Sequence, residues 1–160
     1  MSLDSVRAFL SQHAPDLTIL ELPESTATVA QAAAGHKVDP SQIAKTLALR
    51  VGEQVLLLVT CGDARLDNQK AKTSFGGKVR LLIGEEVTAL TGHPVGGVCP
   101  FGLTTPLPVY CDISLRAFKE VLPAAGSTNS ALRISPDRMV ALTQATWVDV
   151  CLSASRESSR

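Results

Sequence analysis

The sequence predicts a single mixed α/β domain, of the α+β kind, in which helices pack on a mixed sheet. Strand-like and helix-like segments interleave along 160 residues, the length of one ordinary domain. Two apolar runs are joined by a short glycine-containing turn, which predicts an antiparallel hairpin within the sheet. Apolar residues make up 45% of the chain and aromatic residues only 4%. We therefore expect a core of Leu, Val, Ile and Ala.

The N-terminal segment carries helix start and stop signals. Ser2 can cap a first helix, which Pro15 ends. Residues 17–22 (LTILEL) are typical of a strand. Thr28 can cap a second helix that closes near Gly35, before a turn at Asp-Pro.

The predicted hairpin joins residues 43–51 (IAKTLALRV) to residues 55–60 (VLLLVT) through the turn at 52–54. The second run is apolar throughout. This pattern predicts a central strand that is covered on both faces.

The rest of the chain continues the alternation of helix and strand. We expect helices at 66–75, 85–90, 114–122 (with Ser114 as its cap) and from Ser135-Pro136-Asp137, and strands at 79–83, 108–113, 131–135 and 147–152. Residues 153–160 (SASRESSR) are predicted to form a flexible tail, which leaves residues 1–152 as the domain.

Charge and cysteine usage exclude several classes of protein. Fifteen basic residues balance fifteen acidic ones, so we expect no DNA partner held by charge along a duplex. No export signal is visible, and the longest apolar run, Val55–Val59, is too short to span a bilayer. The four cysteines are scattered without CxxC or metal-ligand spacing. We therefore expect a cytoplasmic protein with reduced thiols and with no metal, cofactor or membrane partner.

Lys45 is the first candidate for chemistry. Strand alternation places it on the same face as Ile43, Leu47 and Leu49. An ammonium on an apolar face is costly unless it reaches an edge or an anion. Two interpretations stay open: an edge lysine whose stem covers the sheet, or a lysine at the mouth of a pocket that is ready to bind a phosphate or carboxylate.

The segment 91–103 (TGHPVGGVCPFGL) holds four glycines and two prolines. Glycine lets other backbone approach closely, so the question is what comes close to this loop. Its N–H groups could hold an anion or an oxyanion, or the loop could be a tight turn that lets two elements pack. A Cys99 nucleophile with His93 as base is the weaker hypothesis, since Pro94 between them makes local pairing awkward.

Two polar segments complete the candidates. Thr60, Gly62 and Asp63 fall at the end of the predicted central strand, where α/β proteins gather functional groups. Asp63 could instead form a surface pair with Arg65. Asn129 and Ser130 follow Gly126 in a polar loop and could act only as turn formers.

Together these segments resemble the YbaK/ProX family, the free-standing relatives of the editing domain of bacterial prolyl-tRNA synthetases. IAKTL resembles the family's lysine-bearing strand, and VTCGDARLD resembles its central strand and turn. TGHPVGGVCPFGL resembles its glycine–proline loop, with G-x-x-x-P at Gly96–Pro100, and VYCDISL resembles the strand that follows. The resemblance implies a largely antiparallel, barrel-like sheet with helices around it.

The resemblance also implies hydrolysis of the ester between a wrong amino acid and the 3′ end of a tRNA. Lys45 would contact the terminal adenosine or its phosphate, and Gly97 and Val98 would offer N–H groups to the ester carbonyl. The further residues implied in substrate binding are Thr60, Gly62, Asp63, Gly96, Cys99, Pro100, Phe101, Gly102, Asn129 and Ser130. The implied partners are the acceptor end of an aminoacyl-tRNA and, in addition, an aminoacyl-tRNA synthetase.

The side chain that is removed stays open among Ala, Ser, Thr and Cys. Val98 and Cys99 occupy variable loop positions that would set the pocket size, and STNSALRI lacks the histidine of some alanine-removing members. An alternative is a non-catalytic module that binds the charged 3′ end, or a regulatory protein docked on a synthetase. Turnover distinguishes an enzyme from either of these.

Overall fold

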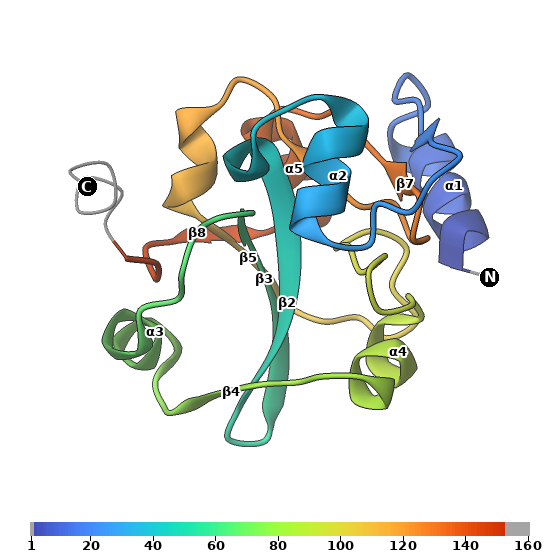
Figure 1. Cartoon of the computed structure of the whole chain (residues 1–160). Coiled ribbons are helices and arrows are strands. Elements are labelled where there is room, and N and C mark those ends of the chain that lie inside the picture. Colours follow the sequence, from blue (N-terminus) through green and yellow to red (C-terminus); the bar gives the residue numbers. More distant parts are fainter. Residues whose placement is uncertain (1, 153–160) are drawn as a thin grey trace.

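The fold is built on a mixed six-stranded sheet with helices on both faces (Figure 1). The computed structural model describes residues 2–152. The sheet order is β4-β2-β3-β5-β8, and β6 also pairs with β2. Its strands are β2 (Ile43–Val51), β3 (Gln54–Cys61), β4 (Val79–Leu81), β5 (Val109–Asp112), β6 (Leu122–Pro123) and β8 (Thr146–Val148), while β1 (Leu20–Glu21) and β7 (Ser130–Ala131) form a separate ladder.

The predicted hairpin is confirmed as the centre of the sheet. Strands β2 and β3 pair antiparallel from Ala44↔Cys61 to Val51↔Gln54. The turn between them uses Gly52 at φ 62°, a conformation that glycine adopts without strain. Residues 56–61 of β3 are all buried, as the apolar run predicts.

The sheet is open at both ends. Most registered residue pairs are antiparallel, but β5, β6 and β8 pair in parallel with their neighbours. Within residues 2–152 no pairing joins β4 to β8, so the expected barrel-like sheet does not close. The two outer strands, β4 and β8, are each three residues long.

Helices divide the apolar residues into clusters on the two faces of the sheet. The helices are α1 (Ser2–His13), α2 (Val29–His36), α3 (Asn68–Phe75), α4 (Glu85–Thr91) and α5 (Pro136–Thr143). The largest cluster joins α1 and α5 to β3 through Leu10, Met139 and Leu57. The opposite face packs Leu49 and Leu58 against α3. Helix α2 packs its alanines on the first residue of β2.

Local capping signals were good predictors of helix starts. Thr28 accepts a hydrogen bond from the Gln31 N–H in a capping box, and Ser135 accepts one from the Arg138 N–H. Helix α3 begins two residues later than predicted because Asp67 caps it. Ser2 lies inside α1 and donates to the Gly126 carbonyl, so the prediction that Ser2 caps this helix is wrong.

The prediction of a helix at 114–122 is also wrong. A short 3-10 turn, Ile113–Ala117, takes its place, and its cap is Asp112, whose carboxylate accepts from the Ser114 N–H. Phe118 is already extended, and the chain goes on to pair with β2 as β6. This pairing ends the turn that the local sequence would continue.

Five predicted strands are shorter than expected, at 17–22, 79–83, 108–113, 131–135 and 147–152. Each is limited by the length over which a partner strand runs beside it. The predicted tail at 153–160 lies outside the described residues. Within residues 2–152, no helix is long and apolar enough to cross a bilayer.

Candidate functional site

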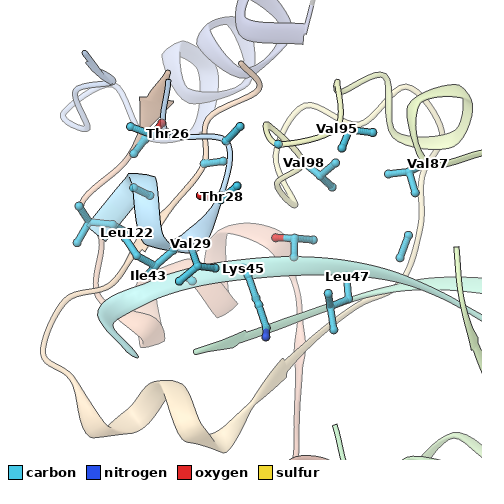
Figure 2. A pocket seen from close by; sticks show the side chains of 18 of the residues that line it. Thr26, Thr28, Val29, Ile43, Lys45, Leu47, Val87, Val95, Val98 and Leu122 are labelled. Carbon is cyan, nitrogen blue, oxygen red and sulfur yellow. The ribbon is translucent and has the colours of Figure 1, made fainter. Parts of the chain in front are cut away.

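A pocket of about 300 Å³ opens where α2, β2 and the loop after α4 meet (Figure 2). One wall comes from residues 26–29 and the inner face of α2. Residues 43–48 of β2 form the floor, and segment 81–98 supplies the opposite wall. The lining is mainly aliphatic, so the pocket suits a small, largely apolar group.

Lys45 lies on this floor, but its ammonium turns away from the cavity. Its stem lines the pocket, and Nζ donates to the Ala64 carbonyl at 2.8 Å. Figure 2 shows the side chain descending from β2 while Val95 and Val98 lie above the strand. The amine is half-buried and can exchange the carbonyl for an anion without leaving the strand.

The glycines of the loop at residues 91–103 lie against the backbone of two other segments. Gly96 has φ 88°, and a Cβ there would lie 2.6 Å from the Ala27 Cβ. A Cβ on Gly97 would lie 2.8 Å from backbone atoms of Ser127. The loop therefore packs its backbone against the segments before α2 and before β7, which closes the pocket on that side.

Some N–H groups of the same loop are used in hydrogen bonds within the protein, and others are not. The Gly97 N–H donates to the Pro94 carbonyl at 2.9 Å, and the Gly97 carbonyl accepts from the Gly126 N–H. The Gly96 and Val98 N–H groups donate to no acceptor within residues 2–152, and both residues line the pocket. Gly97 itself lies behind the pocket wall.

His93 and Cys99 do meet, contrary to the expectation that Pro94 keeps them apart. Cys99 Sγ lies 3.5 Å from His93 Nε2, and both side chains are fully buried. His93 Nε2 lies 2.7 Å from the Phe101 carbonyl, which can only accept, so this nitrogen carries the proton. Burial raises the pKa of the Cys99 thiol to about 12 and lowers the pKa of His93. The pair is therefore a sealed contact in the core.

The C-terminal half of the loop does not line the pocket. Cys99, Pro100 and Phe101 are buried, and Gly102 packs on the backbone of α1 at Ser5. These four positions were predicted to bind substrate; the structure buries the first three and leaves Gly102 partly exposed against α1, and none of the four lines the pocket.

The end of β3 also lies apart from the pocket. Thr60 is buried and donates to the Cys61 carbonyl, while Gly62 packs tightly against Pro40 and Val29. Asp63 lines a second hollow, of about 620 Å³, with Asp112 and other residues. No ion pair between Asp63 and Arg65 forms in the part of the chain that the structure describes.

Of the two predicted polar residues Asn129 and Ser130, only Ser130, at the start of β7, lines the pocket. The Ser130 hydroxyl shares a hydrogen bond of 2.6 Å with the Ser127 hydroxyl. The Asn129 amide instead donates to the Leu22 carbonyl at 2.8 Å, which ties two loops together.

Sequence reasoning missed two polar groups in the pocket wall. Thr46 Oγ1 and His36 Nε2 are buried, and neither has a hydrogen-bond partner within residues 2–152. Burial, and then the charge of Arg133, lower the pKa of His36, which favours the neutral ring. Thr46 could have been found as the polar residue between Ala44 and Ala48 on one strand face. His36 left no such signal.

The donor set gives no metal-binding cluster. Within the described ranges, no three His, Cys, Asp or Glu side chains converge.

Comparison with known proteins identifies the family. A family model described as "Aminoacyl-tRNA editing domain" matches residues 23–142. The chain belongs to this family. The match includes the whole pocket, from Thr26 to Ala131.

Several known proteins are similar to this chain over most of its length. "Uncharacterized protein YwhH" of Bacillus subtilis is 46% identical over 153 residues, which cover 94% of this chain and 98% of that protein. "Putative Cys-tRNA(Pro)/Cys-tRNA(Cys) deacylase EbsC" of Enterococcus faecalis is 27% identical, covering 71% and 70%. A crystal structure of "a putative trans-editing enzyme for prolyl tRNA synthetase" is 36% identical with a TM-score of 0.87, covering 95% of this chain and 98% of that one.

Proposed function

We propose that this editing domain is a trans-editing deacylase that hydrolyses the ester of a small mischarged amino acid from tRNA. The observation that carries the proposal is the shared pocket: the lysine strand and the first half of the glycine–proline loop face one small aliphatic cavity. A cavity of about 300 Å³ fits the side chains of Ala, Ser, Thr or Cys together with part of the ester. The name of the enterococcal relative and the description of the crystal structure support the same activity.

In this proposal each part of the pocket binds a different part of the substrate. The amino acid lies between α2 and Val98, and the free N–H groups of Gly96 and Val98 point their dipoles toward the ester carbonyl. Lys45 leaves the Ala64 carbonyl for a phosphate of the terminal nucleotides, since an ion pair is the stronger bond. The ammonium thus anchors the nucleotide on one side of β2 while the amino acid occupies the other.

The chemical step is hydrolysis by water. The water oxygen forms a bond to the carbonyl carbon, and the ester C–O bond breaks. One proton of the water passes to the tRNA oxygen, which leaves as a hydroxyl, and the other passes to solvent as the amino acid leaves as its carboxylate. An aminoacyl ester is activated enough that orientation and oxyanion donors can supply much of the rate. Cys99 takes no part, because it is fully buried and its thiol pKa is about 12.

A panel of charged tRNAs tests this function. The purified protein would be incubated with tRNAs carrying Ala, Ser, Thr, Cys or Pro, on cognate and non-cognate bodies, and loss of the ester followed. We expect release of one or two small amino acids. Retention of the charged 3′ end without release would contradict the deacylase and support a binding module. Because the substrate belongs to translation, we expect the protein in the cytoplasm, acting with or beside a synthetase.

A further inference from the structure

The outer edge of β2 is paired at its two ends and free in the middle. β6 pairs with Ile43 and Ala44, and β4 pairs with residues 49–51. No strand in residues 2–152 pairs with 45–47 on that side. This gap in the ladder lies on the floor of the pocket.

Thr46 presents its main chain to this gap. The Ala48 carbonyl accepts from the Leu82 N–H at 2.9 Å on the outer side of β2. Main-chain groups two residues apart in an antiparallel strand point to the same side. The Thr46 N–H and carbonyl therefore face outward as well, and no acceptor or donor in the described part of the chain meets them there.

The Thr46 side chain adds a second unused acceptor. Its hydroxyl is buried at the pocket floor and has no hydrogen-bond partner among the described residues. A buried polar group left unpaired is costly, and a strand edge left open invites pairing by another main chain. A bound ligand would relieve both costs at one residue.

The substrate class of the pocket has a matching donor. Every aminoacyl ester carries an α-ammonium group with three N–H donors. The Lys45 ammonium leaves β2 at the neighbouring position and bonds Ala64, so it does not occupy the acceptors of Thr46. No acidic side chain from residues 2–152 lines this pocket, so neutral oxygens are the acceptors that remain there for a cation.

We propose that the free edge of β2 at Thr46 is the binding site for the α-ammonium of the aminoacyl group, with the Thr46 carbonyl and hydroxyl as acceptors. The assignment rests on the proposed deacylase function. It makes Thr46 a binding residue for the part that all aminoacyl esters share, and leaves the choice of side chain to the aliphatic walls.

The test compares an aminoacyl-tRNA with the matching 2-hydroxyacyl-tRNA, in which a hydroxyl replaces the ammonium. We expect the wild-type protein to hydrolyse the aminoacyl ester with a kcat/KM roughly 10- to 100-fold higher, the value of one or two charge-assisted hydrogen bonds. Thr46→Val keeps the shape and removes the hydroxyl, and should lower this ratio about tenfold. Thr46→Ser should keep the ratio.

Thr26→Val is the matched control, since the Thr26 hydroxyl also borders the pocket but already bonds the Thr128 carbonyl. It should leave the ratio at the wild-type value. Thr46→Val should melt at or above the wild-type temperature, because it removes an unpaired buried hydroxyl. Loss of folding therefore cannot account for the expected change.

An unchanged ratio in Thr46→Val would overturn the assignment, even if both rates fell together. If the wild-type protein releases no amino acid at all, the deacylase proposal fails separately. Binding of 3′-amide analogues of aminoacyl-adenosine, with an amine or a hydroxyl on the α-carbon, then decides the matter by calorimetry. A preference for the amine that Thr46→Val loses would support the site, and equal binding of both analogues would overturn it.

Discussion

The centre of β2 and the His93–Cys99 contact are two polar regions of one domain with opposite properties. Lys45 and Thr46 lie on the floor of an open pocket, and Thr46 keeps unused hydrogen-bonding groups there. His93 and Cys99 have the residue types of a catalytic dyad and lie 3.5 Å apart, but both are fully buried. Access of ligands to a side chain and its unused hydrogen-bonding groups therefore indicate a functional site better than the residue type does.

Removing the amine of Lys45 should have the largest effect. Lys45→Ala is expected to lower kcat/KM for deacylation about 100-fold or more, because a charge-assisted contact to the nucleotide is lost. Lys72→Ala, at an exposed position of α3, is the control and should stay near wild type. Steady-state rates on one mischarged tRNA measure both. Full activity in Lys45→Ala would contradict the role proposed for Lys45.

Gly97→Ala tests the close packing that holds the pocket wall. Its Cβ would lie 2.8 Å from the Ser127 backbone, so the loop has to shift. We expect a loss of about 1–3 kcal/mol in the free energy of unfolding and a fall of roughly tenfold in kcat/KM. Gly77→Ala is the control, since its nearest neighbour is a side-chain methyl at 3.3 Å. Denaturant melts of the two variants should differ clearly, and equal stability would contradict the packing.

Replacing Val98 and Cys99 separately tests which of these two loop residues contacts the amino acid. Val98 lines the pocket, whereas Cys99 is buried behind it. Val98→Ala should shift selectivity toward the larger amino acids by roughly tenfold, the worth of a methylene or two in a small pocket. Cys99→Ala should leave the order of substrates unchanged. A shift in the Cys99 variant alone would mean that the loop faces the other way during catalysis.

The smallest effect on activity is expected from Cys99→Ser. Deacylation should stay within about threefold of wild type, while stability falls by about 1–2 kcal/mol because a hydroxyl replaces a buried thiol. The raised pKa of the thiol, about 12, means that it stays protonated at pH 8, so alkylation of the native protein should be slow. Rapid alkylation at pH 8 that stops deacylation would favour a cysteine mechanism.

Local signals in the sequence predicted the parts of the fold that depend on a few neighbouring residues. The hairpin and the caps at Thr28 and Ser135 are of this kind. The 3-10 turn after β5 was missed because pairing of β6 with β2 decides where it ends. Strand lengths likewise depend on partners that are distant in the sequence.

Local sequence signals likewise predicted only part of the candidate site. The lysine strand and the glycine loop left signals in the sequence, and the structure brings Lys45, Gly96, Val98 and Ser130 to one pocket. The residues after Val98 turn inward, so Cys99, Pro100 and Phe101 are buried and do not line the pocket. The wall formed by α2 and the gap between β4 and β6 exist only after folding, and Thr46 acquires its place from them.

The most direct test of the account is the rate of ester loss from one mischarged tRNA, measured in parallel for wild type, Lys45→Ala and Cys99→Ser. We predict rapid loss with wild type and with Cys99→Ser, and almost none with Lys45→Ala. The reverse pattern, an active Lys45→Ala and an inactive Cys99→Ser that is still folded, would contradict the account. That result would indicate that the Cys99 thiol, and not a water molecule in the pocket, attacks the ester.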